Sequence, residues 1–78
     1  MPNENQGELR KLPSVEKVLS SPELVPDIER YSHPVVTATV REIIDKIREH
    51  VTRGGQTPAF DAIVEMVKYH LVAEWPGF

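Results

Sequence analysis

The sequence has no cysteine among its 78 residues, which excludes disulfide bridges and thiolate metal sites. Its longest wholly apolar runs are two or three residues, whereas a helix that crosses a bilayer needs ~20. The opening residues, MPNENQGELRK, also lack the apolar segment of a signal peptide. We therefore expect a protein of the reducing cytoplasm that contacts no membrane.

The length of 78 residues limits the chain to one domain. A chain this short buries only ~60% of the surface that its unfolded form exposes, so its core is thin. No room remains for a substrate cleft between two layers of structure. The length thus favours a binding or assembly module over a self-contained enzyme.

The formal net charge is −3, which weakens long-range attraction to nucleic acid. The charge is unevenly distributed: residues 36–53 sum to +1, whereas residues 21–35 and 54–78 each sum to −2. A surface that binds phosphates would therefore have to be a local basic stripe.

Start signals for helices mark the first half of the chain. Residues 1–8 are polar and predict a mobile tail, followed by a helical domain over residues 9–74. Ser14 is placed to cap a short helix that ends near Ser20. Its apolar face consists of Val15, Val18 and Leu19.

The dipeptide Ser21-Pro22 repeats this start signal. Pro26 follows one turn later, where it would remove a backbone hydrogen bond. Residues 22–31 are therefore predicted either as a short distorted helix or as two turns. Their apolar side would be Leu24, Val25 and Ile28.

The clearest helix is predicted to begin at His33-Pro34 and to run to Arg53. Gly54 follows, and glycine suits the left-handed backbone conformation that commonly ends a helix. Six branched apolar residues follow the 3.6-residue period closely. They are Val36, Val40, Ile43, Ile44, Ile47 and Val51.

A last helix is predicted over residues 58–73, with Asp61 in its first turn. Its buried stripe would be Ala59, Ile63, Met66, Val67 and Leu71. A loop of about four residues would pair it with the preceding helix as an antiparallel hairpin. The predicted fold is all-α: a small bundle of about four helices, with two short ones packed on that longer hairpin.

No constellation of side chains forms a complete catalytic site. The histidines His33, His50 and His70 stand in no HxxxH or HExxH arrangement, so no metal site is predicted. The serines Ser14, Ser20, Ser21 and Ser32 are explained by helix starts, and no GxSxG is present. Gly54-Gly55 lacks the GK[ST] of a phosphate loop. Acidic pairs such as Glu42 and Asp45 have the helical spacing of a solvated face.

Basic residues are the remaining candidates for a function, because arginine and lysine can hold phosphates. An ordinary solvated helix face is the alternative interpretation. The aromatic residues Tyr31, Tyr69, Trp75 and the two phenylalanines are able to stack on bases, although packing is the commoner use. The candidate RNA contacts are Arg10, Lys11, Lys17, Arg41, Lys46, Arg48 and Arg53.

The run from Leu12 to Leu19, LPSVEKVL, followed by Ser21-Pro22, resembles the opening of bacterial selenocysteine synthase, L-seryl-tRNA(Sec) selenium transferase. The resemblance spans about residues 9–53. It continues through Tyr31-Ser32-His33 and the helical run that contains TVR and IDKIR. Because Ser32 stands where the family has glycine, the resemblance does not carry over a sharp backbone turn at this position.

The resemblance implies a part of an enzyme that converts seryl-tRNA(Sec) to selenocysteinyl-tRNA(Sec). The family's enzymes are homo-oligomers, typically decamers, that use pyridoxal phosphate. Their catalytic lysine and cofactor-binding residues belong to a large domain that is absent from this sequence. This chain would be the amino-terminal domain that recognises tRNA(Sec), without a cofactor or catalytic residue of its own. Residues 75–78 would begin the linker to that domain.

A second hypothesis makes the chain a helical protein-interaction or oligomer-assembly module without RNA binding. Residues 58–78 would then dock on a partner or on the enzyme's own catalytic domain, with Trp75 and Phe78 as anchors. A stable dimer unaffected by RNA would favour this alternative. A stand-alone enzyme is the third and weakest interpretation.

Overall fold

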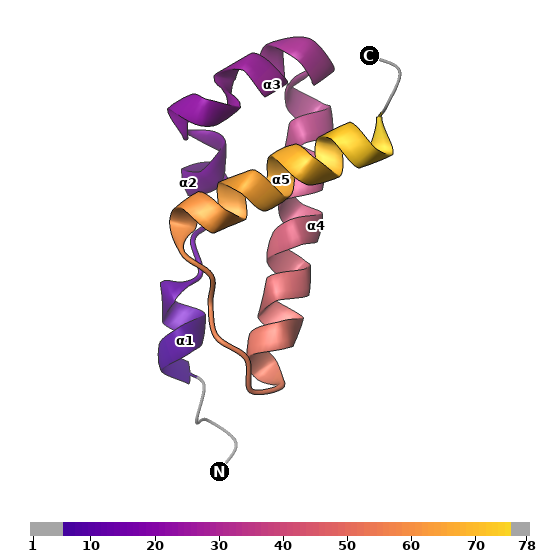
Figure 1. Cartoon of the computed structure of the whole chain (residues 1–78). Coiled ribbons are helices and arrows are strands. Elements are labelled where there is room, and N and C mark those ends of the chain that lie inside the picture. Colours follow the sequence, from indigo (N-terminus) through magenta and orange to yellow (C-terminus); the bar gives the residue numbers. More distant parts are fainter. Residues whose placement is uncertain (1–5, 76–78) are drawn as a thin grey trace.

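The computed structural model describes residues 6–75, and this part of the chain folds into helices without a strand (Figure 1). The elements are α1 (Gln6–Lys11), α2 (Val15–Leu19), the 3-10 helix η1 (Pro22–Leu24), α3 (Val25–Tyr31), α4 (His33–Thr52) and α5 (Phe60–Glu74). The predicted all-α class is confirmed. The predicted anchor Phe78 lies outside the described residues.

Helix α1 begins at Gln6, within the segment 1–8 that was predicted as a tail. Glu8 explains why this part is ordered. The backbone N–H of Thr57 donates to Glu8 Oε1 at 2.8 Å, and the Thr57 hydroxyl donates to the Glu8 carbonyl oxygen at 2.6 Å. The Thr57 N–H, together with the nearby Lys11 ammonium, lowers the pKa of Glu8. Residues 6–8 are thus helical, and Glu8 is hydrogen-bonded to Thr57, while residues 1–5 lie outside the described part.

The predicted serine caps are confirmed at two helix starts. Ser14 Oγ accepts from the Lys17 N–H at 3.1 Å, and Ser21 Oγ accepts from the Glu23 N–H at 3.3 Å. Ser20 instead ends α2, where its hydroxyl donates to the Lys17 carbonyl oxygen. Its predicted place at a helix start is therefore wrong.

The two alternatives for residues 22–31 are resolved by the position of Pro26. It lies in the first turn of α3, where a backbone N–H has no partner within the helix. The segment is a 3-10 turn followed by a regular short helix. Leu24 is buried and Ile28 half-buried, but Val25 is 49% exposed. Val25, the first residue of α3, therefore does not belong to the predicted apolar side.

Ser32 separates α3 from α4 by a sharp turn, with φ of 99° and ψ of 153°. The turn is present although the residue is not glycine. This region of backbone conformation costs a residue with a Cβ about 1–3 kcal/mol. The Ser32 side chain does not offset this conformational cost by capping α4, because it makes no capping hydrogen bond to that helix.

We expect Ser32→Gly to raise the free energy of unfolding by about 1 kcal/mol, since relief of the strain exceeds the entropy that glycine loses on folding. Urea unfolding followed by circular dichroism measures the change. Ser32→Ala is the matched control, because it removes the hydroxyl but keeps the Cβ, and we expect no gain from it. A glycine variant no more stable than the alanine variant would show that the turn is unstrained.

Helix α4 is the central element, and all six of its predicted core residues are buried. Thr39 is buried with them, and its hydroxyl donates to the Val35 carbonyl oxygen at 3.0 Å. The helix ends at Thr52, and Gly54 shortly after it has a φ of +113°, the left-handed conformation that was predicted for it. At Gly55 a Cβ would meet the ring of His50, an exposed side chain that would have to move aside.

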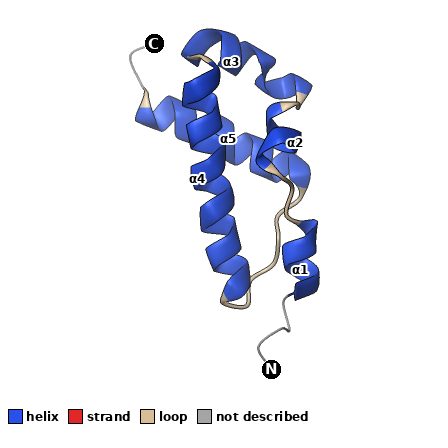
Figure 2. Ribbon diagram, turned by 180° about the vertical axis from the view of Figure 1, so that it is seen from behind, coloured by secondary structure: helices blue, strands red, loops and turns tan. Residues whose placement is uncertain are grey.

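Helix α5 crosses α4 obliquely and also passes over α2, as the two opposite views show (Figures 1 and 2). This differs from the side-by-side antiparallel hairpin that was predicted. The connection over residues 53–59 is longer than the predicted loop. It runs back alongside α1, where Thr57 is bound to Glu8, and delivers the chain to α2 before α5 begins.

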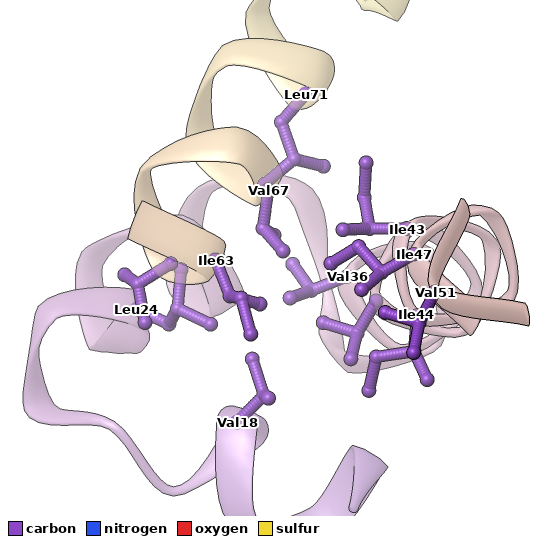
Figure 3. Packing of buried hydrophobic residues seen from close by; sticks show 12 residues of the cluster. Val18, Leu24, Val36, Ile43, Ile44, Ile47, Val51, Ile63, Val67 and Leu71 are labelled. Carbon is purple, nitrogen blue, oxygen red and sulfur yellow. The ribbon is translucent and has the colours of Figure 1, made fainter. Parts of the chain in front are cut away.

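The core lies where α5 meets α4, α2 and η1 (Figure 3). Ile63, Val67 and Leu71 project from α5 toward α4, while Val18 and Leu24 close the other side. Val64 is buried as well, whereas Met66 is 37% exposed. Helix α5 packs against α4 and also against α2 and η1, so its buried sector is centred near Val64 and Val67. The prediction that Met66 is buried is therefore wrong. Ala59 is also exposed, since it precedes the helix as its N-cap residue.

Candidate nucleic-acid interface

The seven predicted RNA contacts fall into two groups in the structure. Arg10, Lys11 and Lys17 line one hollow, between the α1–α2 junction and the start of α5. The other four residues belong to α4 and its end: Arg41, Lys46, Arg48 and Arg53. The fold thus brings three of the predicted contacts together across a helix break.

The hollow has a volume of about 440 Å³. We call it the basic hollow. Its three cations are accompanied by Ser14 and by four half-buried apolar residues, and no carboxylate belongs to its lining among residues 6–75. The apolar residues are Leu12, Pro13, Pro58 and Phe60.

Local sequence explains one wall of the basic hollow. Pro13 interrupts the helical run after α1, and Ser14 then caps α2. The break places Arg10 and Lys17 on different helices that border the same space. The opposite wall, Pro58 and Phe60, is held near by the hydrogen bonds between Glu8 and Thr57.

Two cations of the basic hollow are available to a ligand. Arg10 and Lys17 make no ion pair with any residue that the structure describes, and both are exposed. Lys11 is paired with Glu8, with 2.9 Å between Nζ and Oε2. Unpaired guanidinium and ammonium groups are the donors that phosphate oxygens prefer.

The outer face of α4 is electrically mixed. Lys46 Nζ lies 3.9 Å from Glu42 Oε2, and the Arg48 guanidinium donates to Asp45 Oδ1 at 3.0 Å. A shallow depression on this face is lined by three carboxylates and two cations: Glu42, Asp45, Glu49, Lys46 and Arg48. Arg41 and Arg53 carry no ion pair within residues 6–75. The four α4 residues stay predicted contacts, with weaker electrostatic support than the basic hollow.

Histidines do not gather with acids into a metal site anywhere in the described residues. His70 approaches Glu42 at 3.3 Å and so joins α5 to α4. His33 lies 3.3 Å from the Thr37 hydroxyl at the start of α4. None of the described helices is long and apolar enough to cross a membrane.

The lysines of the chain do not fit a pyridoxal phosphate site, which requires a lysine amine for the cofactor. Lys68 is the half-buried lysine, but its ammonium donates to Asp27 at 2.7 Å and links α5 to α3. Lys11, Lys17 and Lys46 are exposed on the surface. No cofactor chemistry is therefore assigned to these residues.

Sequence reasoning missed the apolar wall of the basic hollow. Pro58 was interpreted as a helix start, whereas α5 begins at Phe60. Pro58 and Phe60 border the same hollow as Arg10 because Thr57 is hydrogen-bonded to Glu8. Glu8 and Thr57 are 49 positions apart in the sequence. Patterns of three to four residues carry no signal for such a contact.

Comparison with known proteins places these observations in a family. A family model described as "Selenocysteine synthase N terminal" matches residues 9–48. L-seryl-tRNA(Sec) selenium transferase of Rhizobium meliloti is 37% identical over 57 residues, which are 73% of this chain. The proteins of the same name from Carboxydothermus hydrogenoformans and Haemophilus influenzae are 37% identical over 46 residues and 33% identical over 51 residues, covering 59% and 65% of this chain.

The aligned regions cover 12%, 10% and 11% of the lengths of these three relatives, so the similarity concerns a small part of each. No solved structure matches the chain significantly. The family model covers about half of the sequence, from α1 into α4, and includes the Leu12–Leu19 run. The chain therefore belongs to the selenocysteine synthase amino-terminal family.

Proposed function

We propose that this chain recognises tRNA(Sec), as the amino-terminal domain of a selenocysteine synthase that converts seryl-tRNA(Sec) to selenocysteinyl-tRNA(Sec). The observation that carries the proposal is the basic hollow. Arg10, Lys11 and Lys17 converge there without a carboxylate in the lining that the structure describes. Two of these cations, Arg10 and Lys17, make no ion pair with another described residue, which suits contacts with the phosphates and sugars of a folded RNA.

The proposal extends to the rest of the enzyme through the family. A catalytic domain elsewhere in the protein would carry out the chemistry, bind pyridoxal phosphate and form the homo-oligomer. The whole enzyme would act in the cytoplasm. The relatives are named as seryl-tRNA(Sec) transferases, which is consistent with this division of labour. The chain described here would hold the RNA while that domain acts on the attached serine.

Binding by the isolated chain should be weak and sensitive to salt. Few phosphates can be neutralised by a surface of this size, and the net charge of −3 opposes the approach of RNA. The basic hollow provides local attraction within a Debye length, about 10 Å at 0.1 M salt. Low ionic strength is therefore the appropriate condition for a test.

A second candidate function is protein interaction, and the outer side of α5 favours it. Met66, Tyr69 and Val72 are 37%, 77% and 61% exposed, on the side of the helix turned away from the core. Trp75, a predicted anchor, is 39% exposed. Apolar side chains grouped in this way are a common feature of contact surfaces.

Sedimentation velocity separates the two functions in one experiment. We expect the chain alone to sediment as a monomer and, at low salt, to co-sediment with tRNA(Sec). A chain that dimerises with the same affinity with and without RNA, and leaves the RNA free, would contradict RNA recognition and support the α5 surface. Tyr69→Ser would then dissociate the dimer, because it removes the most exposed aromatic ring of that surface.

A further inference from the structure

The basic hollow combines two kinds of surface that a phosphate backbone alone would not use together. Arg10, Lys11 and Lys17 supply positive charge, whereas Pro58 and Phe60 supply apolar area that remains partly open. The phosphates of a duplex need only the charge. An apolar wall is matched by a ligand that presents a flat apolar part beside its phosphate.

From this combination we infer that the basic hollow holds an unstacked nucleotide, with its base against the Phe60 ring and its phosphate on Arg10 and Lys17. The inference rests on the proposed function and specifies which part of the RNA enters. Bases become available in this way in loops, bulges and ends, where proteins stack them on aromatic rings. The ligand class is thus a looped or single-stranded RNA segment rather than a regular helix.

Size and position agree with such an occupant. A volume of about 440 Å³ lies within the range of about 300–1,000 Å³ found for small-molecule sites. Phe60 packs with its inner side against the core and is half-buried, so the ring is held in place before a ligand arrives. A ring that is already ordered loses little conformational freedom when a base stacks on it.

The hydrogen bonds between Glu8 and Thr57 keep the two walls of the hollow together. They fix the residue just before Pro58 to α1, the helix that carries Arg10 and Lys11. The Thr57 N–H and the Lys11 ammonium lower the pKa of Glu8, so its carboxylate stays charged to a lower pH than that of an ordinary glutamate, and the connection is intact at neutral pH. Phosphate-binding and base-binding groups therefore stay at a fixed separation.

The test uses an unstructured, uridine-rich RNA with one central adenosine, and the same RNA with that base deleted to leave an abasic sugar. Both carry the same phosphates. We expect the abasic RNA to bind the chain about tenfold more weakly at low salt, within the range of about 1–3 kcal/mol for one base stacked on an aromatic side chain. Chemical-shift titration yields the dissociation constants and shows whether residues around Phe60 respond.

Phe60→Leu provides the matched protein variant, because it keeps an apolar side chain against the core but removes the aromatic face. We expect it to weaken binding of the intact RNA about tenfold and to erase the difference between the two RNAs. Phe60→Tyr should preserve that difference. The comparison of the two RNAs on the unmodified chain remains decisive if the leucine variant folds poorly.

The other outcomes distinguish failure of the base site from failure of tRNA recognition. Equal binding of the two RNAs, weakened by loss of Arg10 and Lys17, would overturn the base site and leave tRNA recognition intact. Binding of tRNA(Sec) without binding of either oligonucleotide would do the same. If no RNA bound, both proposals would fail. Preferential binding of an acidic, phenylalanine-containing peptide in the hollow would replace RNA by a protein ligand.

Discussion

Replacing Ile63 by alanine should lower the free energy of unfolding by about 2–5 kcal/mol, the cost of deleting buried methyl groups and leaving a cavity. Ile63 has no exposed surface and lies between Val18, Leu24 and Val36 (Figure 3). It therefore joins α5 to three other elements at once. A chain of this length has a total stability of about 4–12 kcal/mol, so much of it would be lost.

Urea unfolding followed by circular dichroism measures this effect, and Val72→Ala is its matched control. Val72 lies on the same helix but is 61% exposed, so its truncation should change stability by less than about 0.5 kcal/mol. A loss below about 1 kcal/mol for Ile63→Ala would contradict the described packing of α5. Equal effects of the two substitutions would do so as well.

The second large effect concerns RNA. Replacing both Arg10 and Lys17 by glutamine should weaken binding of tRNA(Sec) about a hundredfold or more at low salt, because hydrogen bonds from charged groups contribute about 1.5–3 kcal/mol each and every 1.4 kcal/mol is about tenfold. The dependence of affinity on salt should also become shallower, since each lost phosphate contact reduces the slope by about 0.7–0.9. Fluorescence anisotropy over a salt series measures both quantities.

Lys46→Gln combined with Arg48→Gln changes the net charge by the same amount on the outer face of α4. Both cations there are paired with carboxylates. We expect a smaller loss of affinity from this variant, because its surroundings already repel phosphate. A larger loss from the α4 variant than from the basic-hollow variant would move the RNA contact to α4.

Local patterns predicted the long helix well. The six apolar residues of α4 repeat at helical spacing, and Gly54 marks the end, so both buried face and boundary follow from residues close in sequence. The caps at Ser14 and Ser21 were predictable for the same reason. The resemblance carried by the Leu12–Leu19 run supplied the family, which the comparisons confirm.

Contacts between distant residues explain what the sequence did not reveal. The order of residues 6–8 depends on Thr57, and the oblique path of α5 depends on where the connection over residues 53–59 is held. The turn at Ser32 has a positive φ, which a residue with a Cβ disfavours, so the residue type did not predict it. The basic hollow, likewise, needed Arg10 and Phe60 to be brought together by the fold.

The most direct measurement of the central claim is a chemical-shift titration of the isotopically labelled chain at low salt, with tRNA(Sec) and with an elongator tRNA in parallel. We expect the shifts to concentrate between Arg10 and Lys17 and near Phe60, and we expect tRNA(Sec) to produce them at lower concentration than the elongator tRNA. An absence of shifts with tRNA(Sec), or equal shifts with both RNAs, would contradict tRNA(Sec) recognition by this chain.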